Sequence, residues 1–226
     1  MWFKEAVVWR FIKHTNIVPF LGVEEDGDSL SLISEWMPGE DTRKYIKTHP
    51  DSNRLSLIMD AAQGLLYLHE TGIVHGDLKS TNILVDIDGR ARLADFGLAR
   101  VVYNNESFNH ESNAIPKQGA LVWSAPELLA PGRFGLEDQD PSQESDVYAF
   151  AMVIWEIFTG VYPYSGDVMA AYSILNGIRP PRPADATELG LSDSIWHLME
   201  RCWDQDRHNR PTMEIVVEEL RRAIGE

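Results

Sequence analysis

The stretch from Ser52 to Asn82 places the strongest constraint on the fold of this chain. Its first part repeats apolar residues every three or four positions, at Leu55, Ile58, Met59, Ala62, Leu65 and Leu66. This spacing predicts an amphipathic helix over 52–70, with Ser52 as its N-cap and Gly72 just past its end. The helix runs into the polar segment His75–Asn82, which holds an acid, a base and an amide. Polar side chains on a loop between rigid elements predict a functional site.

Shorter patterns lie on both sides of this helix. A helical pattern at Trp2–Lys13 leads into strands predicted at Asn16–Val23 and Leu30–Trp36, which an acidic turn joins as an antiparallel hairpin. Two short strands at 83–85 and 90–93 flank the turn Asp88-Gly89, and a polar loop then extends to about Pro126. Further helices are predicted at Ser145–Thr159, Asp167–Leu175, Asp193–Trp203 and Pro211–Ile224. This order predicts an α+β fold with two unequal lobes.

Composition excludes several classes of function. The net charge of −15 argues against a nucleic-acid partner, because phosphate binding requires a concentrated basic surface. The longest apolar run begins at Val147, is far shorter than a membrane span and contains Glu156. Lys4 and Glu5 interrupt the apolar run that a secretory signal needs, and the single cysteine, Cys202, forms no internal disulfide. We expect a cytoplasmic protein without membrane contact; a basic, amphipathic mitochondrial presequence is the alternative, against which Glu5 and the lack of serine count.

Three motifs follow one another in a fixed order. They are HGDLKSTN at His75–Asn82, Asp95-Phe96-Gly97 directly after a predicted strand, and Ala125-Pro126-Glu127 at the end of the long loop. In this order and at these distances they resemble the catalytic loop, the metal-binding motif and the activation-segment end of eukaryotic protein kinases. The segments SDVYAFAMVIWEIFTG from Ser145 and CWDQDRHNRPT from Cys202 are similar to the same family, so the resemblance covers essentially all 226 residues.

The resemblance implies a particular branch and a division of the chain. A lysine two residues after the acid, together with the segment VWSAPE around Trp123, is similar to the tyrosine-kinase-like branch of serine/threonine kinases. The fold is then protein-kinase-like, with a truncated small β lobe and a complete, mainly helical large lobe. Residues 1–37 would form the remainder of the small lobe and residues 38–226 the large lobe, with the catalytic loop and activation segment.

Each motif residue receives a role in phosphoryl transfer. Asp77 is the candidate for orienting the substrate hydroxyl and accepting its proton. Asn82 and Asp95 offer the oxygen ligands that Mg²⁺ prefers, and Lys79 offers positive charge to the transferring phosphate. Taken singly, each residue has a simpler explanation, since an Asp at a helix-to-loop boundary is more often a cap. The ordered set, rather than any one member, indicates a kinase that uses ATP, Mg²⁺ and a protein substrate.

The resemblance also places the nucleotide. The segment Leu32–Met37 is similar to the strand and hinge that contact adenine, with Ser34 at the gatekeeper position and with Glu35 and Met37 contacting the base. Leu84 is a further nucleotide-binding candidate, and Glu5 stands where the regulatory helix of a kinase carries its ion-pairing glutamate. An ordinary core strand and a solvated helix charge are the alternatives for the hinge and for Glu5.

Several departures from the family pattern leave three hypotheses open. The chain contains no GxGxxG, only four residues precede Glu5, so its lysine partner is missing, and Ala120 stands where threonine is usual. The first hypothesis is an active serine/threonine kinase represented by a truncated product or an incomplete gene model. The second is a catalytically impaired interaction module, and the third is a fragment that folds poorly because a sheet edge is exposed.

Two further predictions concern the segment between Asp95 and Glu127. In most kinases that are regulated through this segment, an arginine at the position of Gly76 binds a phosphate on the segment. Because Gly76 has no side chain to do so, we expect activity without phosphorylation of Tyr103, Ser107 or Ser112. Glu127 and Arg210 match the buried ion pair that ties the end of the segment to the late helices.

Overall fold

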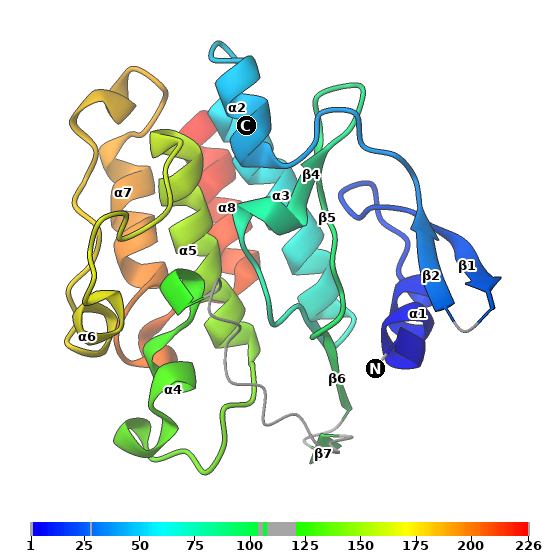
Figure 1. Cartoon of the computed structure of the whole chain (residues 1–226). Helices are drawn as coiled ribbons and strands as arrows, with labels where there is room; N and C mark the ends of the chain where they lie inside the picture. The colour runs from blue at the N-terminus through cyan, green and yellow to red at the C-terminus, as the bar shows by residue number, and fades with distance from the viewer. Residues whose placement is uncertain (1, 28, 104–105, 108–120, 226) are drawn as a thin grey trace.

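The computed structural model describes residues 2–27, 29–103, 106–107 and 121–225. A helix and a β-hairpin lie on one side of a larger, mainly helical body (Figure 1). The predicted α+β class is confirmed. The helices are α1 Trp2–Phe11, α2 Thr42–Thr48, α3 Arg54–Glu70, α4 Pro126–Leu129, α5 Gln143–Thr159, α6 Ala170–Leu175, α7 Asp193–Cys202 and α8 Met213–Ile224. The strands are β1 Phe20–Asp26, β2 Ser29–Ser34, β3 Ile73–Val74, β4 Ile83–Val85, β5 Ala91–Leu93, β6 Arg100–Tyr103 and β7 Glu106–Ser107. Short 3-10 helices lie at η1 Ser80–Asn82, η2 Leu121–Trp123, η3 Pro131–Phe134, η4 Ala184–Thr187 and η5 Arg207–Asn209.

The strand predicted at Asn16–Val23 is wrong in its first half. Strands β1 and β2 form the expected antiparallel hairpin, but β1 begins only at Phe20. Ile17 instead forms a parallel bridge with Leu93, and the amide of Val18 donates to the Leu93 carbonyl at 2.9 Å. Pro19 has no N–H to continue a ladder, which explains the break between the two pairings. The hairpin is thereby joined through backbone hydrogen bonds to β5.

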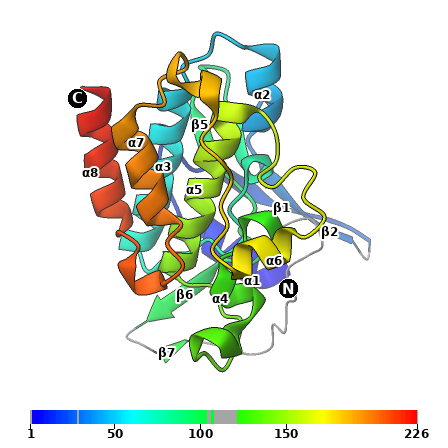
Figure 2. The same cartoon turned by 90° about the vertical axis from the view of Figure 1, so that its left-hand side faces the viewer.

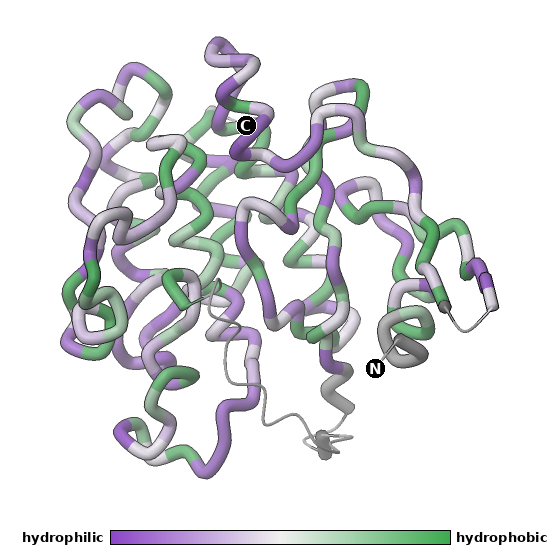
Figure 3. Tube along the Cα trace, in the orientation of Figure 1, coloured by the Kyte–Doolittle hydropathy of each residue, from purple (hydrophilic) through white to green (hydrophobic). Residues whose placement is uncertain are grey.

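Helix α5 forms the buried centre of the body. Every residue from Ser145 to Phe158 is buried, and α5 contacts α3 and α7 while α8 packs on α3 and α7. Figure 2 shows these four helices as neighbours, and Figure 3 shows apolar residues along them with hydrophilic segments in the outer loops. No helix among the described residues is both long and apolar enough to cross a membrane.

Two helices begin at other residues than predicted, because of the side chains that cap them. Asn53, not Ser52, caps α3, since its Oδ1 accepts from the amides of Leu55 at 3.0 Å and Ser56 at 3.2 Å. Gly72 lies just past the end of α3 with φ of 73°, as predicted. Helix α5 begins at Gln143, two residues before the predicted start at Ser145, because Ser142 and Ser145 form a capping box.

Other boundaries differ by one to three residues. Helix α1 ends at Phe11 instead of Lys13, α6 begins at Ala170 instead of Asp167, α7 ends at Cys202, and α8 begins at Met213. Oδ1 of Asp167 accepts from the amide of Met169 at 2.8 Å, so Asp167 closes a turn before α6 instead of starting the helix.

Short elements escaped prediction. Helix α2 buries only Thr42 and Ile46, which is too few to produce an apolar period. Strands β3 and β6 share a ladder of only two residue pairs, Ile73 with Val101 and Val74 with Arg100. Such short helices and strands are stabilised by contacts with the surrounding structure, and the local sequence gives little indication of these contacts.

Candidate active site

A buried carboxylate from α5 holds the backbone of the loop His75–Asn82. Asp146 accepts hydrogen bonds from the amide of His75 at 2.8 Å and from the amide of Gly76 at 2.9 Å. Its Oδ2 also lies 3.0 Å from Nε2 of His69, in the last turn of α3. The side chain of Asp146 is only 2% exposed, so these bonds are shielded from water. Asp146 is not among the predicted site residues, because an acid in the first turn of a helix is common and does not by itself indicate a site.

Gly76 makes the turn that brings these amides to Asp146. Its φ of 78° lies in the left-handed region, which glycine occupies without steric cost. A Cβ at this position would lie 2.9 Å from the carbonyl oxygen of Leu98 and 3.4 Å from side-chain carbons of Pro141. Backbone conformation and available space therefore both favour glycine here.

The structure brings Asp77, Lys79 and Asn82 together. Nζ of Lys79 lies 2.6 Å from Oδ2 of Asp77. Nδ2 of Asn82 donates to the Asp77 carbonyl oxygen at 2.7 Å and to Oδ2 at 3.3 Å. The turn η1 produces this arrangement by bringing Asn82 back toward Asp77. Because its nitrogen bonds to Asp77, Asn82 has its amide oxygen available for a hard cation such as Mg²⁺.

The β4–β5 hairpin carries Asp95 to the same region. The amide of Ala94 donates to the backbone carbonyl of Asn82 at 2.8 Å, and Nε2 of His75 lies 3.1 Å from the Ala94 carbonyl oxygen. Asp95 itself is exposed and has φ of 62°, a conformation that costs free energy for any residue other than glycine. Asp95 directly follows Ala94, whose amide is bonded to Asn82. Its exposed carboxylate is therefore suitable as a ligand for a metal ion.

Phe96 connects this region to α1. It is buried, and its ring centroid lies 5.5 Å from that of His75 and 5.5 Å from that of Trp9. The indole nitrogen of Trp9 donates to the Val18 carbonyl at 2.7 Å, which fixes α1 against the body. Trp9 was not predicted to have this role. Glu5 belongs to α1, but its side chain lies outside the described residues.

The predicted hinge residues lead into a segment that lies beside β4. Met37 is buried and Glu35 is exposed, in the segment that follows β2. The amide of Gly39 donates to the carbonyl of Val85 at 2.9 Å, which brings this segment next to the strand that contains half-buried Leu84. The amide of Glu35 is already bonded to the carbonyl of Pro19 at 3.0 Å, so Glu35 has its carbonyl rather than its N–H to offer a ligand. These contacts bring Leu84 close to the hinge segment.

The predicted ion pair between Glu127 and Arg210 is confirmed. Nη1 and Nη2 of Arg210 lie 2.6 and 2.7 Å from the two carboxylate oxygens of Glu127. The side chain of Arg210 is 0% exposed and that of Glu127 is 3% exposed. This bidentate pair joins α4 to the segment between η5 and α8.

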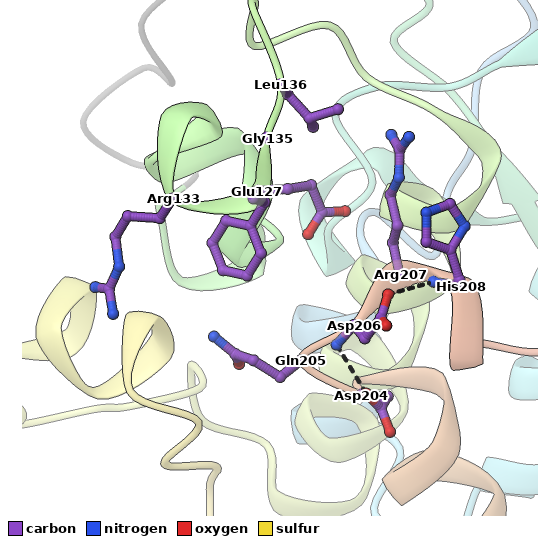
Figure 4. Close-up of a pocket in the computed structure, with 10 residues that line it drawn as sticks. Glu127, Arg133, Gly135, Leu136, Asp204, Gln205, Asp206, Arg207 and His208 are labelled. Carbon is purple, nitrogen blue, oxygen red and sulfur yellow. Dashed lines mark hydrogen bonds between the residues drawn. The ribbon is translucent and has the colours of Figure 1, made fainter.

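A pocket of about 710 Å³ opens beside Glu127. Figure 4 shows the two sides of this pocket. One side is formed by η3 and the following Gly135 and Leu136, and the other by the segment 204–208, which supplies acidic and basic side chains. None of the residues predicted to bind the nucleotide or metal lines it. It is therefore separate from the loop around Asp77.

Some predicted positions cannot be placed in this site. Ser112 and Ala120 lie outside the described residues, as do the side chains of Tyr103 and Ser107. The expectation of activity without phosphorylation of this segment stays a prediction.

Comparison with known proteins finds one family. Residues 1–220 match the family described as "Protein tyrosine and serine/threonine kinase". The chain is 30% identical over 230 residues to the serine/threonine-protein kinase STY17 of Arabidopsis thaliana, covering 99% of this chain and 37% of that protein. It is 33% identical over 221 residues to the mitogen-activated protein kinase kinase kinase mkh1 of Cytospora mali, covering 96% of this chain and 12% of that protein. It is 32% identical over 224 residues to the tyrosine-protein kinase Fer of Rattus norvegicus, covering 96% of this chain and 25% of that protein. The chain thus spans between 12% and 37% of the length of these three relatives.

Proposed function

The chain belongs to the protein tyrosine and serine/threonine kinase family, and we propose that it transfers the γ-phosphate of ATP to serine or threonine hydroxyls of protein substrates. The observation that supports this most is the cluster of Asp77, Lys79 and Asn82, linked through the Ala94 amide to the start of the Asp95 motif. A carboxylate, a cation and an amide oxygen in one loop, with a second carboxylate beside it, are the groups that phosphoryl transfer requires.

The mechanism follows from what each side chain can do. Asp77 orients the substrate hydroxyl and accepts its proton as the oxygen attacks the γ-phosphorus of ATP and ADP leaves. Lys79, which contacts Asp77, balances the negative charge on the transferring phosphoryl group. Asn82 and Asp95 are the residues that would hold Mg²⁺, because an amide oxygen and a carboxylate are suitable hard ligands. Mg²⁺ held by these two residues would offset the negative charge of the phosphates.

The nucleotide site is proposed at the junction of residues 1–37 and 38–226, which we treat as the small and large lobes. The backbone of Glu35 and Met37 would contact adenine, and Leu84 of β4 would pack against its face. Glu5 is proposed as the glutamate of the regulatory helix. Three contacts support this placement: the Gly39–Val85 hydrogen bond beside Leu84, the Ile17–Leu93 bridge, and the packing of Trp9 on Phe96.

The choice of serine or threonine rests on Lys79 and on the VWSAPE segment around Trp123. The relatives include kinases named for serine/threonine and one named for tyrosine, so the experiment must distinguish the acceptors. Phosphoamino-acid analysis of a phosphorylated generic protein is the direct test. We expect phosphoserine and phosphothreonine, and phosphotyrosine alone would contradict the proposal.

The surroundings of the protein are part of the same proposal. A net charge of −15 makes nucleic acid an unsuitable partner, and we propose a cytoplasmic location without membrane attachment.

A catalytically impaired interaction module is the second candidate. The absence of any GxGxxG in these 226 residues favours it. The coding sequence before Met1 discriminates between the two candidates. A glycine-rich loop and an Ala-x-Lys strand there, in frame, would support the active enzyme, whereas their absence would support the module.

We expect the 226-residue chain itself to bind Mg-ATP more weakly than the micromolar range, because it contains no glycine-rich loop to cover the phosphates. Isothermal titration calorimetry measures this directly. The control is an extended enzyme, defined as this chain with a kinase glycine-rich loop and Ala-x-Lys strand joined before Met1. Micromolar binding by the 226-residue chain would show that the added strands are dispensable for the nucleotide.

We expect Asp95→Asn in the extended enzyme to weaken Mg-ATP binding by about tenfold or more, because it removes the charged metal ligand. Titrating turnover with Mg²⁺ should show a higher half-saturating concentration. Asp88→Asn removes the same charge from an exposed turn and is the matched control. Equal Mg²⁺ dependence in both variants would exclude Asp95 as a ligand.

A further inference from the structure

Glu156 is a buried carboxylate that the proposed mechanism does not use. It lies in α5 and its residue is 0% exposed. The hydroxyl of Ser80 donates to Oε1 at 2.6 Å, and the indole nitrogen of Trp123 donates to Oε2 at 3.0 Å. Each carboxylate oxygen therefore has its own partner, from a different segment of the chain.

The two partners of Glu156 belong to the loop that contains Asp77 and to the segment that ends at Glu127. Ser80 directly follows Lys79 and begins η1, and its carbonyl also accepts from the hydroxyl of Thr42 at 3.1 Å. Trp123 ends η2, two residues before Ala125-Pro126-Glu127. A single side chain from the central helix is thus bonded to both the loop of Asp77 and the segment that ends at Glu127.

The surroundings of Glu156 make this connection rigid. The ring of Tyr162 meets Trp123 edge-on with centroids 5.3 Å apart, and the Arg43 guanidinium lies 3.7 Å from the Tyr162 ring centroid.

Burial raises the pKa of Glu156 to about 7, while the bonds from Ser80 and Trp123 and the charge of Arg43 act in the opposite direction. Both protonation states are therefore accessible near neutral pH.

We propose that Glu156 is a positioning residue, which aligns the Asp77 loop with the Trp123 segment through its two hydrogen bonds. The inference rests on the proposed function, because the benefit of this alignment is a protein hydroxyl held at the right place relative to Asp77. It adds to that function a residue that touches neither the nucleotide nor the predicted metal ligands.

The two protonation states of Glu156 affect its partners differently. An indole N–H can only donate, so the unprotonated oxygen must stay with Trp123. In the acid form the proton then lies on Oε1 and is donated to Ser80, which reverses the direction of that hydrogen bond. The loop side of the connection therefore changes with the charge of Glu156, and the indole N–H reports the change.

The first test needs no catalysis and uses the 226-residue chain. With ¹⁵N-labelled tryptophan, the indole N–H resonance of Trp123 is assigned by its loss in Trp123→Phe. We expect its chemical shift to titrate with a midpoint near pH 7, and Glu156→Gln, which keeps the shape but cannot titrate, to abolish this step. A Trp123 resonance that is the same in the wild type and in Glu156→Gln across the whole pH range would overturn the proposal.

The second test asks whether the two segments communicate through Glu156. Ser80→Ala removes a donor that favours the ionised form, so the midpoint at Trp123 should move to higher pH. Thr81→Ala, an exposed hydroxyl on the same turn, should leave the midpoint in place. No shift in Ser80→Ala would show that Ser80 and Trp123 are independent, and a downward shift would contradict the role of the Ser80 hydroxyl as a donor to the ionised carboxylate.

The third test measures catalysis in the extended enzyme. Glu156→Gln should lower kcat about tenfold, the equivalent of one charge-assisted hydrogen bond, with KM for ATP unchanged. It should also flatten the part of the pH profile near 7, whereas Glu214→Gln, the same change at an exposed position of α8, should behave as wild type. An unaltered kcat and pH profile in Glu156→Gln would refute a positioning role. If even the wild-type extended enzyme fails to turn over, the proposed function fails, while the indole titration still decides the coupling.

Discussion

Replacing Asp77 by Asn in the extended enzyme is expected to lower kcat on the order of 10²–10⁴-fold, the usual contribution of a general base. Asn cannot accept the proton of the substrate hydroxyl, but it keeps the shape of the side chain and can still accept a hydrogen bond from Lys79. The affinity for Mg-ATP should change little, since the lost interaction belongs to the transition state. Steady-state kinetics together with calorimetric titration of Mg-ATP separate the two effects.

The control for this experiment is Asp88→Asn, which removes one carboxylate charge from the exposed turn between β4 and β5. We expect wild-type kinetics from it. A loss in kcat for Asp77→Asn accompanied by an equal loss in Mg-ATP affinity would assign Asp77 to nucleotide binding. In that case its role as a base would be wrong.

Arg210→Ala is expected to destabilise the chain by about 3–5 kcal/mol, because it leaves the Glu127 carboxylate buried without its partner. Glu127 is 3% exposed and has both oxygens bonded to Arg210, so little water can replace the lost guanidinium. Arg210 also donates to the carbonyls of Asp204 and Glu144, at 3.0 Å each, which adds to the loss. Urea unfolding followed by tryptophan fluorescence measures the change in the free energy of unfolding.

An exposed pair in the same region is the matched control. Arg201 contacts both oxygens of Glu219 at 2.9 Å, but the two side chains are 48% and 29% exposed. Arg201→Ala should therefore cost only about 0–1 kcal/mol. Equal destabilisation by the two arginine variants would contradict the importance that we assign to burial of the Glu127–Arg210 pair.

The sequence predicts the site where its chemistry is local. Asp77, Lys79 and Asn82 lie within six residues of one another, and the short turn η1 brings their side chains together. The Asp88-Gly89 turn is likewise encoded locally, because Asp86 accepts from the amides of Asp88 at 3.0 Å and Arg90 at 2.9 Å. The Glu127–Arg210 pair was found only through resemblance, since 83 positions separate its members.

The residues that hold the site in place could not be predicted in this way. Asp146 bonds to the His75 amide across 71 positions, and Glu156 bonds to Ser80 across 76. Within α5 these acids look like interruptions of an apolar pattern, and only the fold shows that each one anchors a loop. For the same reason Ile17 and Val18 suit a hairpin strand by composition, although their actual partner, Leu93, lies on β5.

We propose that this chain holds a phosphoryl-transfer site that acts on serine and threonine. The most direct measurement is transfer of label from γ-labelled ATP to a generic protein by the extended enzyme, with and without chelation of Mg²⁺, followed by phosphoamino-acid analysis. We predict Mg²⁺-dependent formation of phosphoserine and phosphothreonine that Asp77→Asn reduces by at least about a hundredfold. An extended enzyme that binds Mg-ATP yet transfers no label, or transfers it equally well with Asn at position 77, would contradict the claim.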